Sequence, residues 1–392
     1  MSQTTSERLA ELGSAALQPL VSRVLGETGI GFEQWQYEPV FGGFGGGINE
    51  AHRLYRVRGT AYTRGGLRPW SIVLKVLSTT DGSGEPGAWD YWKREALLYQ
   101  SGLLDDLAEG LADGLTVPKC YGVAEPTEGQ AWIWMEDVLE AGDTDAAGRW
   151  RLGQFEMAAE RLGLYNGAYL AGRQPSRLHR QPPWWNRGDW RARLQGGEEF
   201  FTDLPTYRRH PLAQRMIPDE MVPQFVGLWE RRSQLAAELR EGPRCFCHND
   251  AFRRNLVLRR TRSGMEFVAI DWAFAGESAV GEEIAKMVVT SLVFLERPAS
   301  DMRALYETVY NGYIAGLRAA GWAGEEPRVR RNYWAAALLV FLEHTWLGLR
   351  GMNSAFPIEM VEHIYGHSID AIMGQGAALT QFVMALAEEP AP

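Results

Sequence analysis

The stretch of sequence that decides the fold is CHNDAFRRN, residues 247–255, and it is followed by the apolar run FVAID, residues 267–271. Asn255 lies five residues after Asp250, and Asp271 closes the apolar run sixteen residues further on. Phosphoryl transfer requires a carboxylate that accepts the proton of a hydroxyl, together with an amide oxygen and a second carboxylate that hold a metal ion. We therefore predict Asp250 as the catalytic base and Asn255 and Asp271 as ligands of Mg²⁺, which prefers hard oxygen donors.

The residues around this set support the prediction. Short apolar runs at 256–258 and 267–270 are separated by a polar segment, a pattern that is typical of a β-hairpin. Such a hairpin would begin at Asn255 and end at Asp271, so that the two side chains lie side by side. Isolated Asp and Asn residues more often cap turns, but several of them in register favour a site. His248 lies two residues before the predicted base and is expected to tie the loop together rather than to act as a base itself.

An upstream glycine cluster predicts part of the nucleotide side of the site. The segment VFGGFGGGIN, residues 40–49, lies between candidate strands at 34–41 and 52–58. Glycine is needed where backbone amides must approach phosphates closely. The cluster therefore predicts a lid over the nucleotide, although a flexible hairpin tip has the same composition. The residues of this lid are Gly43, Gly45, Gly46 and Gly47.

One lysine, Lys75, interrupts the β-branched run SIVLKVL, residues 71–77. A lone lysine among apolar neighbours is costly unless its charge is paired. The run at 89–104 has helical spacing and places Glu95 where it could form that pair. The pair would direct Lys75 onto the α- and β-phosphates. The alternative is that Glu95 is one of several solvated charges of a helix.

A third segment predicts where the adenine of the nucleotide binds. The apolar strand AWIWM, residues 131–135, runs into an acidic turn formed by Glu136, Asp137 and Val138. In a two-lobed kinase this segment is the hinge between the lobes. Adenine would bond to backbone groups near Glu136 and Val138, and Met135 would pack at the back of the pocket.

The order of these parts resembles the aminoglycoside phosphotransferase and choline kinase group of small-molecule kinases, over residues 35–289. His248-Asn249-Asp250 is similar to the His-Gly-Asp that opens the catalytic loop of that family. Ile270-Asp271-Trp272 is similar to its Ile-Asp-Trp metal strand, and the segment GEEIA, residues 281–285, to its acidic continuation into the next helix. Two features depart from the family pattern: Asn249 stands in place of glycine, and Arg253-Arg254 stands in place of small residues or proline.

The resemblance implies an α+β, two-lobed protein-kinase-like fold with a small antiparallel β-sheet lobe and a larger, mainly helical lobe. The nucleotide-binding lobe would span residues 1–135, and the catalytic and acceptor-binding lobe residues 136–392. The implied cofactors are ATP, or alternatively GTP, and Mg²⁺. A protein kinase is disfavoured because the sequence has neither an Asp-Phe-Gly nor an Ala-Pro-Glu segment around an activation loop. The alternative to an active small-molecule kinase is a catalytically silent nucleotide-binding accessory protein with the same fold.

Composition restricts the class of partner. The chain has 392 residues, 45% of them hydrophobic and 23% charged, which is enough for two cores. Its net charge of −9 disfavours nucleic acid as a partner. The sequence shows no N-terminal signal, and its longest apolar run, residues 334–342, is too short to cross a bilayer. We therefore expect a cytoplasmic protein without a membrane partner. The three cysteines argue against a disulfide framework.

The nature of the acceptor is predicted from two regions of the larger lobe. Residues 184–203 alternate aromatic and acidic side chains, among them Asp189, and a later apolar helix carries Glu343 and Trp346. Carboxylates and aromatic faces attract cations. With the amine-bearing acceptors of the family, this predicts a small cationic acceptor such as an aminoglycoside, an amino sugar or an amino alcohol. The alternative is that these aromatic side chains anchor an insertion and the acidic ones face water.

Overall fold

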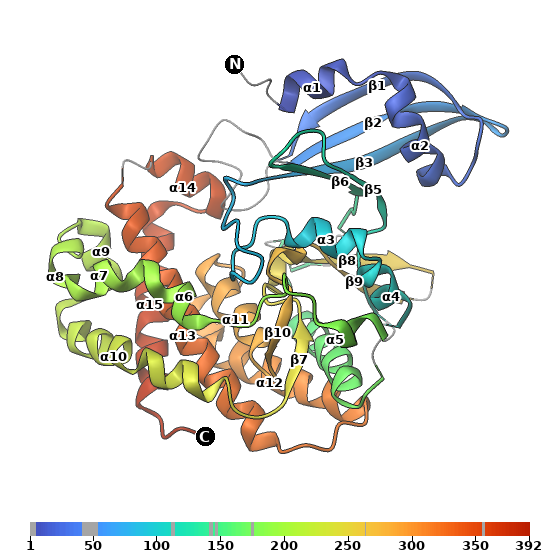
Figure 1. The fold of residues 1–392 in the computed structure, drawn as a ribbon. Helices are drawn as coiled ribbons and strands as arrows, with labels where there is room; N and C mark the ends of the chain where they lie inside the picture. The colour runs from blue at the N-terminus through green and yellow to red at the C-terminus, as the bar shows by residue number, and fades with distance from the viewer. Residues whose placement is uncertain are drawn as a thin grey trace.

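The computed structural model describes residues 5–40, 54–110, 114–140, 144–145, 148–173, 176–262, 264–354 and 357–392. Figure 1 shows two unequal parts: a sheet with two helices near the N-terminus, and a larger, mainly helical part beneath it. The predicted α+β arrangement, with a small antiparallel sheet and a larger helical part, is confirmed.

The small part is a five-stranded sheet with helices α1 (Thr5–Glu11) and α2 (Ser14–Leu25). Every neighbouring pair of strands is antiparallel. In spatial order the strands are β1 (Gly31–Pro39), β2 (Leu54–Thr63), β3 (Gly66–Ser78), β6 (Gln130–Glu136) and β5 (Cys120–Ala124).

The two faces of this sheet have different partners. On β3, Ile72 and Leu74 are buried in a cluster with Val21 of α2. Because side chains alternate along a strand, Lys75 points to the opposite face. The register pairs Lys75 with Ile133, which belongs to the core of the larger part. The face that carries Lys75 is therefore turned toward that larger part.

The helix predicted over residues 89–104 begins later than expected. Residues 82–93 form turns and bends, and the helical segment is divided into α3 (Arg94–Gln100) and α4 (Leu103–Gly110). Glu95 lies in the first turn of α3. The boundary between lobes at residues 135 and 136 stays a prediction; β6, which carries it, ends at Glu136.

The larger part is built around long helices that enclose two small sheets. The long helices are α5 (Leu152–Leu170), α10 (Val222–Glu238), α11 (Glu283–Val293), α12 (Met302–Ala319), α13 (Glu326–Met352) and α15 (Ile369–Glu388). The short ones are η1 (Ser176–Arg180), α6 (Trp190–Leu194), η2 (Gln195–Gly197), α7 (Glu198–Thr202), α8 (Leu204–Tyr207), α9 (Pro211–Met216), η3 (Asp219–Met221), η6 (Ala299–Asp301) and α14 (Ile358–Tyr365).

The two small sheets hold the catalytic segment. Strand β7 (Arg244–Cys247) pairs with β10 (Gly276–Ala279), and β8 (Leu256–Thr261) pairs with β9 (Gly264–Ala269), both antiparallel. The hairpin predicted for residues 256–270 is thereby confirmed. Strand β4 (Leu115–Thr116) adds to this hairpin in parallel to β9.

Helices α5 and α12 pack at very short range. A Cβ atom added to Gly316 of α12 would lie 2.0 Å from the backbone oxygen of Glu160 on α5, so that any side chain there would force the helices apart. Helix α11 is buried along almost its whole length between α12, α13 and α15. It can therefore serve as a rigid support for residues that it presents to the site.

Helix α15 is, among the described residues, the single helix long and apolar enough to cross a membrane by length and composition alone. This helix is longer than the apolar run at 334–342 that the sequence pattern singles out. In the structure α15 contacts α9, α11 and α13 and buries residues such as Leu379 and Val383, as the core helix of a folded domain does.

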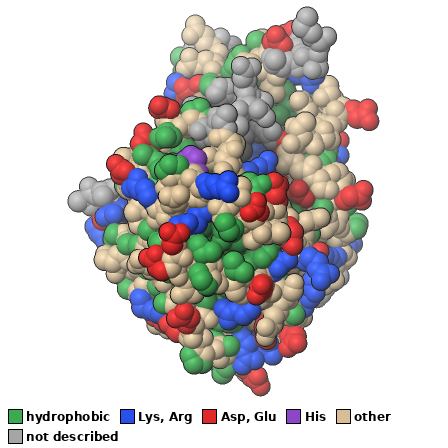
Figure 2. Space-filling model, turned by 90° about the vertical axis from the view of Figure 1, so that its left-hand side faces the viewer, with side chains coloured by type: hydrophobic (Ala, Val, Ile, Leu, Met, Phe, Trp, Pro, Cys, Tyr) green, Lys and Arg blue, Asp and Glu red, His purple; other side chains and the backbone are tan. Residues whose placement is uncertain are grey.

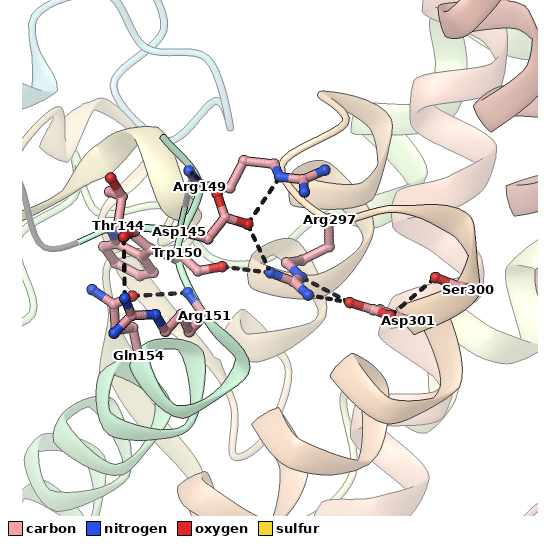
Figure 3. Close-up of polar contacts among 9 residues, drawn as sticks. All are labelled: Thr144, Asp145, Arg149, Trp150, Arg151, Gln154, Arg297, Ser300 and Asp301. Carbon is pink, nitrogen blue, oxygen red and sulfur yellow. Dashed lines mark hydrogen bonds and ion pairs between the residues drawn. The ribbon is translucent and has the colours of Figure 1, made fainter. Parts of the chain in front are cut away.

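A polar network fixes the start of α5 (Figure 3). Arg297 donates a hydrogen bond of 2.9 Å to the backbone oxygen of Trp150 and also bonds to Asp301, while Asp145 pairs with Arg149 and Arg297. The ring of Trp150 is fully buried, and the guanidinium of Arg253 lies over it, 4.8 Å from its centroid. The network therefore also supports the loop that contains Arg253.

The charged side chains on the surface are mixed in sign, as the composition of the sequence leads us to expect. Figure 2 shows, on the side of the molecule that carries α8 and α9, Lys and Arg interspersed with Asp and Glu around a central group of hydrophobic side chains. No large area of one charge covers this face of the described residues.

Candidate active site

Lys75 joins three separate elements. Its Nζ lies 2.6 Å from Oε2 of Glu95 on α3 and 2.7 Å from Oδ1 of Asp271, which follows β9. The other oxygen of Glu95 accepts a hydrogen bond of 3.2 Å from the backbone N–H of Trp272. Glu95 is 1% exposed, so the alternative of a solvated helix charge does not describe it. The structure thus brings together three of the residues predicted for the nucleotide side.

The charges of this group depend on one another. Burial acts against the charge of Lys75, but Asp271 and Glu95 outweigh it and raise the pKa of the ammonium. Burial likewise acts to raise the pKa of Asp271, but Lys75 lowers it below its usual range. Lys75 and Asp271 are therefore both charged at neutral pH.

Asp250 and Asn255 form the second part of the site. Asp250 follows β7, and Asn255 ends the short helix η4 (Arg253–Asn255) just before β8. The Nδ2 of Asn255 donates to Oδ2 of Asp250 at 2.8 Å and to its backbone oxygen at 3.0 Å. No described residue donates a hydrogen bond to the Oδ1 of Asn255, so this neutral oxygen is available to a ligand.

The pKa of Asp250 suits a base. Burial raises it to about 6; Asp271 and Glu343 act in the same direction, and Lys286 and Arg193 oppose them. A carboxylate with a pKa just below neutral is mostly ionised at pH 7 and still has a measurable affinity for a proton. It can therefore accept the proton of a hydroxyl.

His248 has a structural role, as its place in the sequence predicts. Its Nε2 lies 2.8 Å from the backbone oxygen of Ile270, and its Nδ1 accepts a hydrogen bond from the backbone N–H of Asp250. Burial lowers its pKa to about 4, so the ring is neutral. His248 thus connects the two loops that carry Asp250 and Asp271.

Two residues of the site adopt the left-handed backbone conformation. Asn249 has φ 64° and Asp271 has φ 62°. Asn and Asp tolerate this region better than other non-glycine residues. The side chain of Asn249 also donates to the backbone oxygen of Phe274 and accepts from Oγ of Ser278 at 2.7 Å. Asn249 therefore occupies a position that favours glycine and adds two hydrogen bonds to the loop.

Helix α11 supports the catalytic loop through a hydrogen bond. The carboxylate of Glu283, in its first turn, accepts a hydrogen bond of 3.0 Å from the backbone N–H of His248. Burial raises the pKa of Glu283 to about 7. The acidic segment at 281–285 therefore contacts the catalytic loop directly, a role that the sequence pattern did not predict.

The hinge residues lie at and just after the C-terminal end of β6, an inner strand of the small sheet. Met135 is buried, and its register partner is Val73, two residues before Lys75, so Met135 shares the face of that lysine. The carboxylate of Glu136 pairs with Arg259 of β8 at 2.6 Å, and its backbone N–H bonds to Lys119. Val138 is half-buried just beyond the strand.

Asp137, the next residue of the hinge, bonds to residues of β2 and β3, which the sequence did not predict. Asp137 receives two hydrogen bonds from Arg56 of β2, at 2.8 and 3.1 Å, and one of 2.5 Å from Oγ of Ser71. The register places Arg56 opposite Val73, on the face that carries Lys75. This pair ties the hinge to the strand that follows the glycine cluster.

The predicted lid cannot be placed. Its residues Gly43, Gly45, Gly46 and Gly47 lie outside the described residues. The assignment of these glycines to phosphate binding stays a prediction.

The residues predicted to bind a cationic acceptor have protein partners in the structure. Glu343 bonds through Oε1 to Arg193 and through Oε2 to Lys286, the latter at 2.8 Å. Asp189 caps α6 by accepting from the backbone N–H groups of Arg191 and Ala192. Trp346 is buried and packs against the backbone of η2. Their role as acceptor ligands stays a prediction.

The alternating aromatic segment has mainly structural contacts. Trp185 is fully buried beside Phe246, and Phe201 stacks on Trp229. Glu198 pairs with Arg232 at 2.8 Å. These contacts favour the alternative that the segment anchors an insertion on the core.

Three cations of the site were not predicted. Arg94 is fully buried and donates to the backbone oxygens of Ala88, Trp89, Trp184 and Ala273, thereby holding α3 against the segment after Asp271. Lys286 and Arg193 flank Asp250 from α11 and α6. Lys286 carries a sequence signal, since it is a single lysine in an apolar helix.

The donor set fits Mg²⁺. No group of three or more His, Cys, Asp or Glu side chains among the described residues could hold a metal ion unaided. Mg²⁺ is usually bound by one or two carboxylates together with water and substrate phosphates. Asp271, whose side chain is 42% exposed, and the unbonded oxygen of Asn255 would hold the ion in that way.

Comparison with known proteins gives the family that the catalytic segment predicts. Residues 64–327, more than half of the chain, match the phosphotransferase enzyme family. No curated protein matches the sequence. Among solved structures, amicoumacin kinase hAmiN, in complex with AMP-PNP, Ca²⁺ and Ami, is 14% identical, with a TM-score of 0.51 over 97% of this chain and 100% of that one. At this identity the likeness shows the fold alone.

Two further structures score lower. A thermostable mutant of aminoglycoside phosphotransferase APH(4)-Ia, in a ternary complex with ADP and hygromycin B, is 13% identical with a TM-score of 0.45, covering 92% of this chain and 99% of that one. The microcompartment-associated aminopropanol kinase is 14% identical with a TM-score of 0.47, covering 86% and 90%. The resemblance drawn from the catalytic segment is confirmed by the family match. The chain belongs to the phosphotransferase enzyme family.

Proposed function

We propose that this protein is an ATP-dependent kinase that moves the γ-phosphate to a hydroxyl group of a small molecule. The observation that carries the proposal is the position of Lys75, which bonds to both Glu95 and Asp271 within 2.7 Å. This places a fixed cation beside the predicted metal ligand, as contact with the phosphates of a nucleotide requires. The family match supports the same class of reaction.

Each residue then has a distinct task. Asp250 accepts the proton of the acceptor hydroxyl, and Asn255 orients that carboxylate through their 2.8 Å hydrogen bond. Asp271 and Asn255 are the residues that would hold Mg²⁺, which when bound neutralises charge on the β- and γ-phosphates. The presence of these three side chains together with Lys75 disfavours a catalytically silent protein.

The acceptor class is a finer proposal. Amine-bearing compounds, namely aminoglycosides, amino sugars and amino alcohols, are the acceptors that the family resemblance implies. We further propose a cytoplasmic enzyme without nucleic-acid or membrane partners, which its net charge of −9 supports in part.

The test is a screen with the full chain, Mg²⁺ and either ATP or GTP. Hygromycin B, aminopropanol, ethanolamine and a set of neutral and acidic hydroxy compounds are offered, and mass spectrometry detects the gain of one phosphate. We expect one class of acceptor to be phosphorylated with ATP. Binding of ATP without any phosphorylated product across the screen would favour the silent alternative, and failure to bind either nucleotide would refute the proposal.

A further inference from the structure

An open cavity of about 690 Å³ lies on the small sheet beside the hinge. Asp137 of the hinge contributes to its wall together with Arg56 and Ser71. Because side chains alternate along β3, Ser71 and Val73 share the face of Lys75, and the register pairs Val73 with Arg56. The cavity and the ammonium of Lys75 therefore lie on the same face of the sheet.

The distance from Lys75 indicates which part of a nucleotide would meet Arg56. In the proposed function Lys75 contacts the α- and β-phosphates. Val73 precedes it by two residues, which places it roughly 7 Å back along the strand. Met135, the register partner of Val73, is buried on the same face and leads into the hinge. A nucleotide that extends from Lys75 toward the hinge would therefore bring its ribose and then its base beneath Val73 and Arg56.

The guanidinium of Arg56 is fixed by the hinge. Its Nε and one terminal nitrogen donate to the two oxygens of Asp137, at 2.8 and 3.1 Å, and such a two-point contact fixes the plane of the guanidinium. Oγ of Ser71 donates to the same carboxylate at 2.5 Å. The side chain of Asp137 is 8% exposed, whereas that of Arg56 is 31% exposed. The guanidinium is thus held at one edge, and part of the side chain stays open to a ligand.

The charges around Arg56 are balanced. Asp137 pairs with Arg56, and Glu38 lies 3.9 Å from Arg56 and 3.3 Å from Arg58. Two arginines therefore face two carboxylates. A phosphate or an ammonium group gains little from such a balanced set, whereas a neutral aromatic ring can stack on a guanidinium whose edge is already bonded. The base of a nucleotide is a ring of this kind.

We infer that Arg56 binds the base of the nucleotide by stacking its guanidinium on the ring, and that Asp137 holds the guanidinium in the orientation for this contact. The inference rests on the proposed kinase function and deepens it, because it adds a side chain of β2 to the predicted base site of Met135 and the hinge backbone. The competing role for Arg56 is a tie between β2 and the hinge without contact to the base. The test must separate these two roles.

Calorimetric titration of the full chain with three probes tests the inference. The probes are AMP-PNP with Mg²⁺, adenosine, and inorganic tripolyphosphate with Mg²⁺, which carries phosphates without a base. We expect Arg56→Ala to weaken the binding of AMP-PNP and adenosine by at least about fivefold, the loss of one stacking contact. Binding of tripolyphosphate should stay unchanged, which also shows that the variant is folded.

Two further substitutions separate stacking from a tie. Arg56→Tyr breaks the bonds to Asp137 but supplies a flat ring, so it should retain most of the affinity for adenosine. Arg56→Lys keeps a cation that can pair with Asp137 but has no planar head, so it should bind adenosine less tightly than Arg56→Tyr does. The reverse order would mean that Arg56 only ties the strand to the hinge, and the inference would be wrong.

Arg58→Ala is the matched control. Arg58 lies two residues further along β2 on the same face, opposite Ser71, and pairs with Glu38 at 3.3 Å. This variant should keep the wild-type affinity for all three probes.

Unchanged affinity for adenosine and AMP-PNP in Arg56→Ala would overturn the inference. An equal loss for tripolyphosphate, or the same loss in Arg58→Ala, would overturn it as well, because the effect would then not be specific to the base or to Arg56. None of these results contradicts the kinase function. A wild-type chain that binds neither AMP-PNP nor tripolyphosphate with Mg²⁺ would instead refute the proposed kinase function, and the inference with it.

Discussion

Two lysines, the half-buried Lys75 on β3 and the buried Lys286 on α11, have closely similar surroundings on the two sides of the site. Each bonds to a buried glutamate from another element, Glu95 at 2.6 Å or Glu343 at 2.8 Å. Each also lies near an aspartate of the catalytic segment: Lys75 is 2.7 Å from Asp271, and Lys286 is 3.9 Å from Asp250.

The difference between the two groups lies in their charge. Around Lys75 one cation faces two carboxylates, so the group is negative overall and can accept a metal cation with its nucleotide. Around Lys286 a second cation, Arg193, is added, so that two cations face Glu343 and Asp250. The nucleotide side therefore has an excess of carboxylates that a metal ion would balance, whereas the two cations around Lys286 are already balanced by Glu343 and Asp250.

The largest effect is expected from removing the aspartate of the Lys75 group. In Asp271→Ala the phosphates would approach without the ligand that holds the neutralising metal, so Mg-nucleotide binding should be abolished. Titration with ATP in the presence and absence of Mg²⁺ measures this. An Asp271→Ala variant that binds Mg-ATP normally would break the assignment of this group to the nucleotide.

The aspartate of the Lys286 group should behave differently. Asp250→Asn keeps the shape and the neighbours but cannot accept a proton, so turnover should fall by at least about a hundredfold while nucleotide affinity stays nearly intact. The measurements are steady-state rates with the acceptor found in the screen, and the same ATP titration. Equal nucleotide binding by Asp250→Asn and Asp271→Ala, or full turnover in Asp250→Asn, would show that the two sides have been wrongly separated.

Some contacts of the site could be predicted from the sequence, and others could not. The groups that lie close together in the chain were found: Asp250, Asn255 and the hairpin that ends at Asp271. Their geometry depends on local backbone structure, which short patterns describe well. Lys75 and Glu95 were paired because a strand and the next helix have few arrangements.

The contacts on the acceptor side could not be predicted from the sequence in this way. Lys286 interrupts an apolar helix as Lys75 interrupts an apolar strand, so the same argument for a buried partner applied to it and was missed. Its partner Glu343 lies 57 residues away, and Arg193 lies 150 residues from that glutamate. No pattern in the sequence shows that the carboxylate predicted for a cationic acceptor is already bonded to two protein cations.

The pH dependence of the reaction gives a smaller but informative effect. Because only ionised Asp250 accepts a proton, kcat/KM should rise with pH through about 6, the pKa to which burial raises this carboxyl in the free enzyme. Lys286 lowers that pKa, so Lys286→Met should move the rising limb to higher pH. Rates measured from roughly one pH unit below this limb to about two units above it test this.

Lys93→Met serves as the control for this shift. Lys93 pairs with Glu125 at 2.7 Å on the small part and has no contact with Asp250. Its removal should leave the pH profile unchanged. A profile that moves in neither variant would mean that Lys286 does not act on Asp250.

The smallest effect concerns the backbone of the loop that leads into Asp250. Asn249→Gly relieves the left-handed conformation but loses two side-chain hydrogen bonds, to Ser278 and Phe274, so the free energy of unfolding should fall by about 1 kcal/mol. Asn249→Ala loses the same bonds and retains the unfavourable conformation, so it should cost roughly 1 kcal/mol more. Urea unfolding of both variants measures the difference. If glycine stabilised the chain, the two hydrogen bonds would contribute nothing to the stability of the loop, which would then depend on its other contacts, those of His248, Asn255 and Glu283.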